Sequence, residues 1–248
     1  MKYCMHAGGE IDGRIHTNSK EAFDFWEEKG ERCYEFDVVR ISKENYMVSH
    51  DINPKYPQYS LWDFDELLSH TRNDVDLLMI DYKNFTYEDT AEICAYLSNK
   101  IDNGEVDGES IYFEVDNEDM MRAAAPYSNK MNIICYIDES IQMGNSAEMN
   151  QWEDETLISK LRSYGVKAVS YPWIMAMNNM PKFKRLKNAG FIMFSRTRNN
   201  LLNEWVEKVG VDVNIVNEHL TDVQLNNPDL QQYKREYYQQ FKQVLDNL

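Results

Sequence analysis

Long apolar runs are missing from this sequence. None approaches the about 20 consecutive apolar residues that a membrane-spanning helix needs, so stable membrane insertion is not expected. Basic residues are scarce, because 26 Lys and Arg stand against 42 Asp and Glu and give a formal net charge of −16. A nucleic-acid binder normally carries a basic face along the phosphate backbone, and adhesion to anionic lipid also needs basic residues, so this charge argues against both. The same charge permits cation sites rich in carboxylates.

Cysteine is also rare, and the four present show neither a CxxC motif nor the spacing of a zinc site. Each lies in or beside an apolar stretch, which predicts small buried thiols and a reducing, cytoplasmic setting. The four are Cys4, Cys33, Cys94 and Cys135. The N-terminal sequence MKYCMHAGGE is too short and too polar before its first glycines to be a signal peptide. No glycine-rich phosphate loop follows a predicted strand, and no low-complexity linker divides the chain.

Short β-type segments alternate with helical segments along the chain. Eight segments rich in Ile, Val, Phe, Tyr and Met are predicted strands, at residues 2–6, 33–41, 77–83, 110–116, 132–138, 167–173, 191–197 and 213–219. Helical segments lie between them, at residues 19–29, 61–70, 87–101, 117–125, 154–164, 180–189 and 201–209. This alternation predicts one α/β domain over residues 1–248 with the (β/α)₈ TIM-barrel fold. A doubly wound open sheet is the alternative, because alternation alone does not show closure.

The C-terminal tail departs from this alternation. After Pro228, apolar and aromatic residues recur at helical spacing in a segment rich in Gln, Lys and Tyr, which predicts a helix over residues 229–247. We expect this helix to close the outer ring of the barrel as its eighth helix. The alternative is a surface through which the chain forms a homodimer.

Carboxylates gather near the ends of the second and third predicted strands, where a barrel builds its site. Period-two alternation places Glu35 and Asp37 on one face of the second strand and apolar side chains on the other. Asp81 and Lys83 share one face near the end of the third strand. Acids held close together repel one another and need a cation or a shared proton, and hard oxygen ligands favour Mg²⁺ or Ca²⁺. Exposed acids on an edge strand and an ordinary surface Asp–Lys pair are the alternatives.

Two histidines flank this acidic region. His6 ends the first predicted strand and is followed by Ala-Gly-Gly, in which the glycines allow a sharp turn or close approach to a ligand. His50 follows the second predicted strand. Histidine titrates near neutral pH, so the pair suggests a general acid and a general base. His16, in a polar loop, and His70, at a helix end, are expected on the surface.

In this order, the segments resemble the glycerophosphodiester phosphodiesterase family. Four motifs and a segment similar to the family's Glu-Ile-Lys carry the resemblance: His6-Ala-Gly-Gly, Thr17-Asn18-Ser19-Lys-Glu-Ala22-Phe23, Glu35-Phe-Asp37-Val38, His50-Asp51 and Asp81-Tyr-Lys83. They cover residues 1–83, a third of the chain. The rest of the chain resembles the family only in its alternation of strands and helices. Val216-Asn-Glu-His219 lies near the position of the family's final strand motif.

The resemblance implies a TIM barrel of the phosphatidylinositol-phosphodiesterase type that binds one divalent cation, Ca²⁺ or Mg²⁺. The family's metal ligands match Glu35, Asp37 and Asp81, its acid–base pair matches His6 and His50, and its phosphate contact and a nearby asparagine match Lys83 and Asn18. The implied reaction is hydrolysis of a small glycerol phosphodiester to glycerol phosphate and an alcohol. Attack by the neighbouring glycerol hydroxyl, which gives a cyclic phosphate, is the usual proposal. A related lyase that releases the cyclic phosphate and another metal-dependent barrel enzyme are alternatives.

Several positions depart from the family pattern. Ala7 stands where the family usually has an arginine that helps to hold phosphate, and Asp81 replaces the more common Glu, as in related sphingomyelinase D-type members. The family's seventh-strand motif, Trp-Thr-Val-Asn, reads Phe-Ser-Arg-Thr-Arg-Asn at residues 194–199. Arg196 and Arg198 are therefore candidates to replace the missing phosphate contact. These departures favour the alternative of a catalytically weak barrel that binds a phosphorylated ligand.

Four further residues near predicted strand ends are candidates for the site. His219 ends the eighth predicted strand, and Trp173 at the end of the sixth is a candidate to line the pocket for the alcohol part of the substrate. Glu114 and Asp116 share one face of the fourth strand, where they would lie behind the metal ligands or add to them. Packing in the core is the alternative for Trp173.

Overall fold

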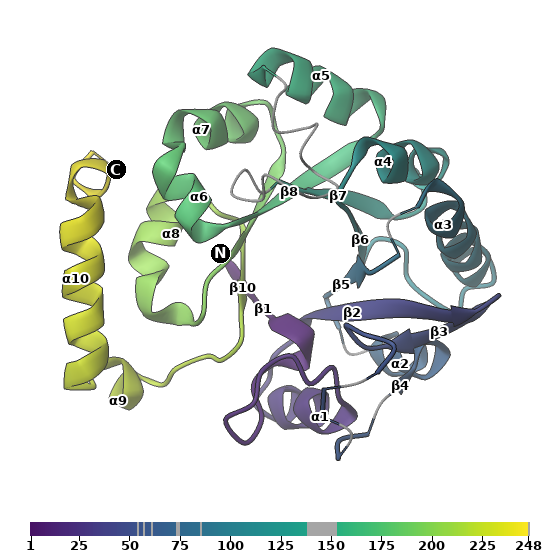
Figure 1. Ribbon diagram of the computed structural model, residues 1–248, viewed down its shortest axis with the longest axis horizontal. Coiled ribbons are helices and arrows are strands. Elements are labelled where there is room, and N and C mark those ends of the chain that lie inside the picture. The colour runs from purple at the N-terminus through teal and green to yellow at the C-terminus, as the bar shows by residue number, and fades with distance from the viewer. Residues whose placement is uncertain are drawn as a thin grey trace.

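Eight parallel strands form a closed barrel in the computed structural model (Figure 1). The structure describes residues 1–248 except 54, 57, 61, 73–74, 85, 138–152 and 248, so the predicted ends at residues 61 and 138 lie outside the described residues. The barrel strands are β1 Lys2–Met5, β2 Cys33–Ser42, β5 Leu77–Tyr82, β6 Ile111–Val115, β7 Asn132–Tyr136, β8 Val166–Pro172, β9 Ile192–Arg196 and β10 Val213–Val216. Because β1 pairs in parallel with both β10 and β2, the sheet closes, and the open-sheet alternative is wrong.

Helices surround this barrel, as the alternation predicts (Figure 1). They are α1 Lys20–Glu28, α2 Phe64–Thr71, α3 Tyr87–Asp102, α4 Glu118–Ala124, α5 Asp154–Ser163, α6 Trp173–Asn178, α7 Met180–Asn188, α8 Asn203–Val209, α9 Asp222–Leu225 and α10 Pro228–Leu245, with short 3₁₀ turns η1 His6–Gly8, η2 Ala125–Tyr127 and η4 Asn200–Leu202. Polar side chains cap the N-termini of several of these helices. The Ser19 hydroxyl accepts the Ala22 N–H at the start of α1, and the Asp63 carboxylate accepts the Asp65 N–H at the start of α2.

The inner face of the barrel has an apolar layer below a polar one. Buried side chains from most of the barrel strands fill the lower layer: Cys4, Cys33, Leu77, Met79, Ile134, Ala168, Phe194, Val213 and Ile215. Two residues further along β2, β5 and β9, the same face presents Glu35, Asp81 and Arg196. The apolar layer closes the bottom of the barrel and thereby confines the charged side chains to its C-terminal end.

A short antiparallel extension was not expected from the sequence. Strand β2 continues beyond the barrel and turns back at Lys43–Glu44 into β3 (Asn45–Val48), which pairs with β4 (Trp62–Asp63). Glu44 has a φ of 57°, the left-handed conformation that allows this tight turn. His50 therefore follows β3 rather than β2, and the hairpin returns it towards the C-terminal end of the barrel.

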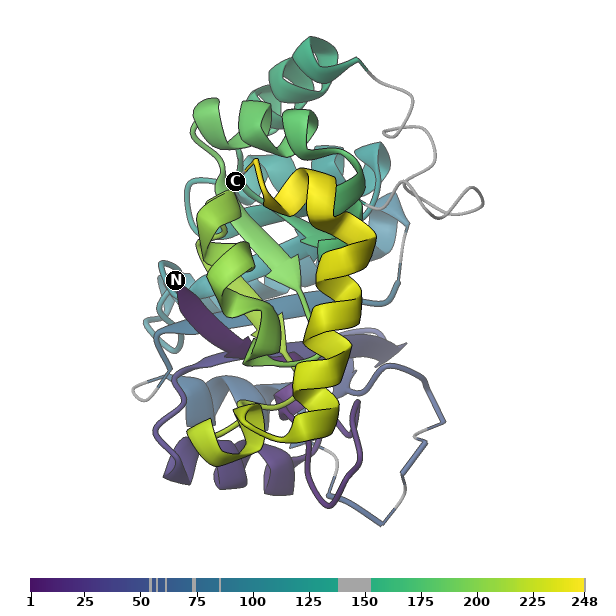
Figure 2. The same ribbon diagram turned by 90° about the vertical axis from the view of Figure 1, so that its left-hand side faces the viewer.

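The C-terminal helix α10 lies beside α8 at the outer edge of the molecule (Figures 1 and 2). The Trp205 ring of α8 stacks on Tyr237 and Tyr238, with centroid distances of 6.0 and 6.2 Å. Lys234 lies over the same indole and pairs with Glu204 at 3.3 Å. Tyr237, Phe241 and Leu245 of α10 are thus buried, and Tyr237 and Tyr238 pack on α8.

The four cysteines are free and buried, as the sequence predicts. Among the described residues, no helix combines the length and the apolar character needed to cross a bilayer.

Replacing Trp205 by Ala removes the ring on which α10 packs. We expect the free energy of unfolding to fall by about 3 kcal/mol, because a large buried aromatic side chain is lost. Urea denaturation measures this change. Tyr233→Ala is the matched control on α10, since Tyr233 is 53% exposed and its removal should change stability little. Equal losses in the two variants would contradict the packing of α10 on Trp205.

Candidate active site

Three carboxylates meet at the C-terminal end of the barrel. Glu35 and Asp37 extend inward from β2, and Asp81 lies next to Asp37 in the parallel register of β2 and β5. One oxygen of each of the three lies within 4.8 Å of the others. Their exposed fractions are 0, 1 and 5%, so an edge-strand position for these acids is wrong. The period-two pattern of β2 places two of them, and the register of β2 with its neighbour β5 places the third.

The loop after β1 holds two of these acids in place. The Ala7 N–H donates to Glu35 Oε2 at 2.7 Å, and Asn18 Nδ2 donates to Asp37 Oδ2 at 2.7 Å while Asn18 Oδ1 accepts the Asp37 N–H at 3.0 Å. Ala7 and Asn18 both have positive φ, 49° and 51°, which allows the loop to turn these groups towards β2. The expected contact of Asn18 with substrate is therefore corrected, because its buried amide is engaged on both sides by Asp37.

Two cationic side chains lie among the acids. Lys83 Nζ is 2.8 Å from Asp37 Oδ1 and 2.7 Å from Asp81 Oδ2. Arg196 extends from β9 on the far side of the barrel, and its Nη2 is 2.7 Å from Glu114 Oε2 and 3.2 Å from Asp81 Oδ2. Arg196 thus lies at the acid cluster and neutralises buried carboxylates, while its role as a phosphate contact stays a prediction.

Burial and the two cations shift the pKa values of the acids in opposite directions, downward for Asp81 and upward for Glu35, Glu114 and Asp116. Burial alone would raise the pKa of Asp81, but Lys83 and Arg196 outweigh it and hold that pKa below its usual value. Burial and the neighbouring Asp37 raise the pKa of Glu35 to about 8. Burial, with the charge of Asp81, also raises the pKa of Asp116 to about 7, and burial raises the pKa of Glu114. The metal-free site therefore retains protons on some of its acids at neutral pH.

A divalent cation fits this group of side chains. Glu35 Oε1 is buried and has no hydrogen-bond partner among the described residues, so an oxygen with ligand capacity is left in the cluster. The donors are all carboxylate oxygens, the ligand type that Mg²⁺ and Ca²⁺ prefer. A cation would also remove the mutual repulsion that favours protonated Glu35.

His6 lies directly beside the acid cluster. Its Nδ1 is 2.8 Å from Asn217 Oδ1, and its Nε2 is 3.7 Å from Glu35 Oε2. Since an amide oxygen only accepts, the proton resides on Nδ1 and leaves Nε2 with a free lone pair towards the cluster. Burial, and then the charge of Arg196, lower the pKa of His6 to about 4, so the ring is neutral at pH 7. Asn217 was not identified from the sequence, because nothing local links it to His6.

His16 is the second residue that sequence reasoning missed. Its ring packs edge-to-face on His6 with a centroid distance of 4.4 Å, so His16, which was expected on the surface, is half-buried beside the site. His16 has a φ of 59°, which turns the loop inward just before Asn18. His70, in contrast, is exposed on α2 as expected.

His50 lies on the segment after β3, and its side chain is 55% exposed. Its Nδ1 is 3.2 Å from Asp51 Oδ2. His50 and Lys83 line one cavity of about 540 Å³, and His50 and His16 line another of about 180 Å³. The larger cavity thus borders Lys83, which contacts Asp37 and Asp81, and the smaller one borders His16, which packs on His6.

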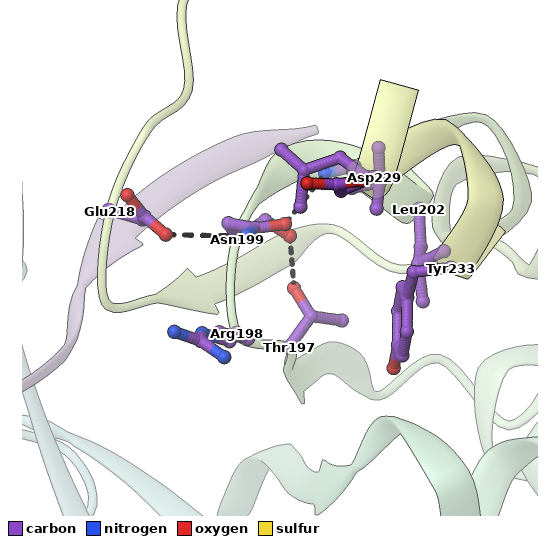
Figure 3. Close-up of a pocket in the computed structure, with 9 residues that line it drawn as sticks. Thr197, Arg198, Asn199, Leu202, Glu218, Asp229 and Tyr233 are labelled. Carbon is purple, nitrogen blue, oxygen red and sulfur yellow. Dashed lines mark hydrogen bonds between the residues drawn. The ribbon is translucent and has the colours of Figure 1, made fainter. Parts of the chain in front are cut away.

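Three other candidates lie elsewhere. His219 Nδ1 pairs with Glu31 at 2.9 Å and its ring packs on Tyr3, because the chain leaves the barrel at Val216 and the strand pattern no longer applies. Trp173 is the first residue of α6 and is 4% exposed within the apolar core. Arg198 lines a different pocket, which it shares with Tyr233 of α10 (Figure 3). Their expected roles at the site are corrected accordingly.

Similarity searches place the fold among known barrels. No family model and no curated protein matches this chain. A solved glycerophosphodiester phosphodiesterase from Parabacteroides distasonis is similar with a TM-score of 0.67 at 14% identity, over 95% of this chain and 97% of that one. One from Thermotoga maritima gives 0.65 at 17% identity, over 87% and 94%. A HpcH/HpaI aldolase/citrate lyase family protein from Burkholderia cenocepacia gives 0.51 at 9% identity, over 97% and 94%. The chain therefore has the barrel fold of glycerophosphodiester phosphodiesterases.

The raised carboxyl pKa values predict how stability depends on pH. Above pH 6.5, folded metal-free protein retains protons on Glu35 and Asp116, with pKa values of about 8 and 7, which the unfolded chain has released. Stability should therefore fall as pH rises from about 6.5 to 8. His6 and His16, whose pKa values are lowered to about 4, have the opposite effect, but only below their ordinary value of 6.5.

Thermal unfolding in the presence of a chelator tests this dependence. The Tm of wild-type protein should fall across the window from pH 6.5 to 8, and Glu35→Gln should reduce the slope. Glu105→Gln is a surface control that should keep it. A Tm that does not change across the window in wild-type protein would contradict the protonated acid cluster.

Proposed function

We propose that this chain hydrolyses glycerol phosphodiesters to glycerol phosphate and an alcohol. The observation that carries the proposal is the convergence of Glu35, Asp37 and Asp81 within 4.8 Å beside His6 and Lys83. Such a site offers a cation for phosphate oxygens and a neutral imidazole for proton transfer, which are the needs of phosphodiester cleavage. The similarity to the barrel fold of glycerophosphodiester phosphodiesterases supports the same class of substrate.

One divalent cation, Mg²⁺ or Ca²⁺, would be held by Glu35, Asp37 and Asp81. When bound, it neutralises the negative charge that develops on phosphate oxygens. Lys83 can assist, since an ammonium group has three donors and two of them are directed at Asp37 and Asp81. The third donor is available to a phosphate oxygen.

The two histidines divide the proton transfers. His6 Nε2 accepts the proton of the glycerol hydroxyl next to the phosphate, as this oxygen forms a bond to phosphorus. His50 donates a proton to the leaving alcohol oxygen as its bond to phosphorus breaks. In the second stage water opens the cyclic phosphate, His50 accepts the water proton, and His6 returns its proton to the glycerol oxygen.

A second candidate function has one observation in its favour. The position after His6 is Ala7, where a phosphate-binding arginine would otherwise stand, and Arg196 is engaged by Glu114 and Asp81. Such a barrel would bind a phosphorylated ligand and turn it over slowly. Phosphorus NMR of a metal-supplemented reaction separates the possibilities: released glycerol phosphate supports the hydrolase, an accumulated cyclic phosphate supports a lyase, and unchanged diester supports the binding protein.

The ligand in this proposed function is a small phosphodiester, and the protein acts in the cytoplasm. Four free buried thiols support a reducing compartment. The net charge of −16 supports neither a nucleic-acid partner nor binding to anionic lipid.

Asn18→Ala should weaken binding of Mg²⁺ or Ca²⁺ by about 10- to 100-fold, because Asp37 loses the amide that orients it. Titration calorimetry measures the affinity without any need for turnover. Asn99→Ala, on the exposed face of α3, is the matched control and should retain wild-type affinity. Unchanged affinity in Asn18→Ala would show that Asp37 is not a ligand or that Asn18 does not position it.

His6→Ala and His50→Ala should each lower kcat by about 10²- to 10⁴-fold, the usual contribution of a positioned proton-transfer group. The two losses should not add in the double variant, because both groups act in one step. A diester with a good leaving group should partly restore His50→Ala but not His6→Ala, since that substrate needs little protonation. Near wild-type turnover of a true substrate by both single variants would overturn the mechanism.

A further inference from the structure

A small cavity lies beside His16 and His50. It has a volume of about 180 Å³ and is lined by His16, Thr17, Ser49, His50, Asp51 and Lys55. His16, which lines the cavity, packs on the ring of His6, and His6 Nε2 lies 3.7 Å from Glu35. The rings of His16 and His6 therefore link the cavity to the carboxylate cluster.

Side chains that can carry positive charge dominate this cavity. His16, His50 and Lys55 face it, and its single carboxylate, Asp51, is already paired with His50 at 3.2 Å. Lys55 contacts the ring of Tyr56 at 5.1 Å, and no ion pair of Lys55 occurs within the described part of the chain. The Ser49 hydroxyl is also committed, since it donates to the Asp51 carbonyl at 2.7 Å. The Thr17 hydroxyl shares a hydrogen bond with Ser19 at 3.1 Å, so the side-chain donors that remain belong to His16, His50 and Lys55.

His16 is close to the other groups that can carry positive charge. Burial, together with the charges of His6, His50 and Lys55, lowers the pKa of His16 to about 4, although the charge of Asp37 acts in the opposite direction. An anion in the cavity would remove this unfavourable crowding and accept hydrogen bonds from both His16 and Lys55.

The chemistry of the reaction indicates which part of a substrate reaches this cavity. His50 is the group that protonates the leaving oxygen, so the leaving alcohol lies against His50, and His50 lines the cavity. We propose that His16 and Lys55 bind an anionic group, a carboxylate or a phosphoryl group, on the leaving alcohol, so that the chain prefers glycerol phosphodiesters whose alcohol is negatively charged. This inference rests on the proposed function.

Two diesters of equal size test the preference. Glycerol phosphate esterified to glycolate carries a carboxylate on its leaving alcohol, and the ester with ethylene glycol does not. Wild-type protein should show at least a tenfold higher kcat/KM for the glycolate diester. His16→Gln and Lys55→Met should each lower the ratio of the two kcat/KM values by about tenfold, the effect of losing one charge-assisted hydrogen bond.

His70→Gln and Lys43→Met are matched controls, because both residues are exposed and lie outside the cavity. They should retain the wild-type ratio. Equal turnover of the two diesters by wild-type protein would overturn the inference, and so would loss of both activities in parallel in the two cavity variants. Lys55 is exposed on a surface segment, so its replacement does not disturb the core.

Binding without turnover separates this inference from the proposed function. Inorganic phosphate added to metal-free protein should shift the imidazole nitrogen resonances of His16 in a saturable manner, leave those of His70 unchanged, and lose this effect in Lys55→Met. Saturable binding with no hydrolysis of any diester would support the anion site and contradict the proposed function. Hydrolysis without an anion effect at His16 would contradict the anion site alone.

Discussion

The site depends on the electrostatic balance between buried carboxylates and the two cations among them. Glu35, Asp37, Asp81 and Glu114 lie inside a barrel whose lower half is apolar, where unpaired charge is strongly disfavoured. Lys83 and Arg196 bind these acids from opposite sides of the barrel. The negative charge that the two cations do not balance is neutralised by protons on Glu35, Glu114 and Asp116. A divalent cation can take the place of these protons. Retention of these acids in the interior is therefore an argument for function, since apolar residues of similar size would fill the same space.

The sequence predicts the barrel and its acid cluster for one physical reason. In parallel strands buried on both faces, side chains alternate strictly, so Glu35 and Asp37 must share a face, and the pairing of β2 with β5 places Asp81 beside Asp37. The same rule directs Arg196 inward. What it does not reveal is the partner of Arg196, because Asp81 is 115 residues away and their contact depends on the closed ring.

The remaining site residues lie where strand alternation no longer applies. Asn18 and His16 are on a loop whose positive φ angles turn them towards β2, and no periodic pattern predicts such a loop. His219 was expected in the site from the strand pattern, but β10 ends at Val216 and the chain turns away towards Glu31. Trp173 was misplaced for a similar reason, since the chain changes from strand to helix at Pro172.

His6 and His50 lie on parts of the chain that differ in how firmly they are packed. His6 belongs to the barrel rim and is held between Asn217 and the acid cluster, whereas His50 and Lys55 lie on one exposed segment between β3 and β4. The described residues between positions 50 and 60 are exposed or half-buried, so changing them costs the packed interior little. A descendant of this chain could therefore acquire a new leaving-group preference by altering this segment alone, while the cation-binding half of the centre stays as it is.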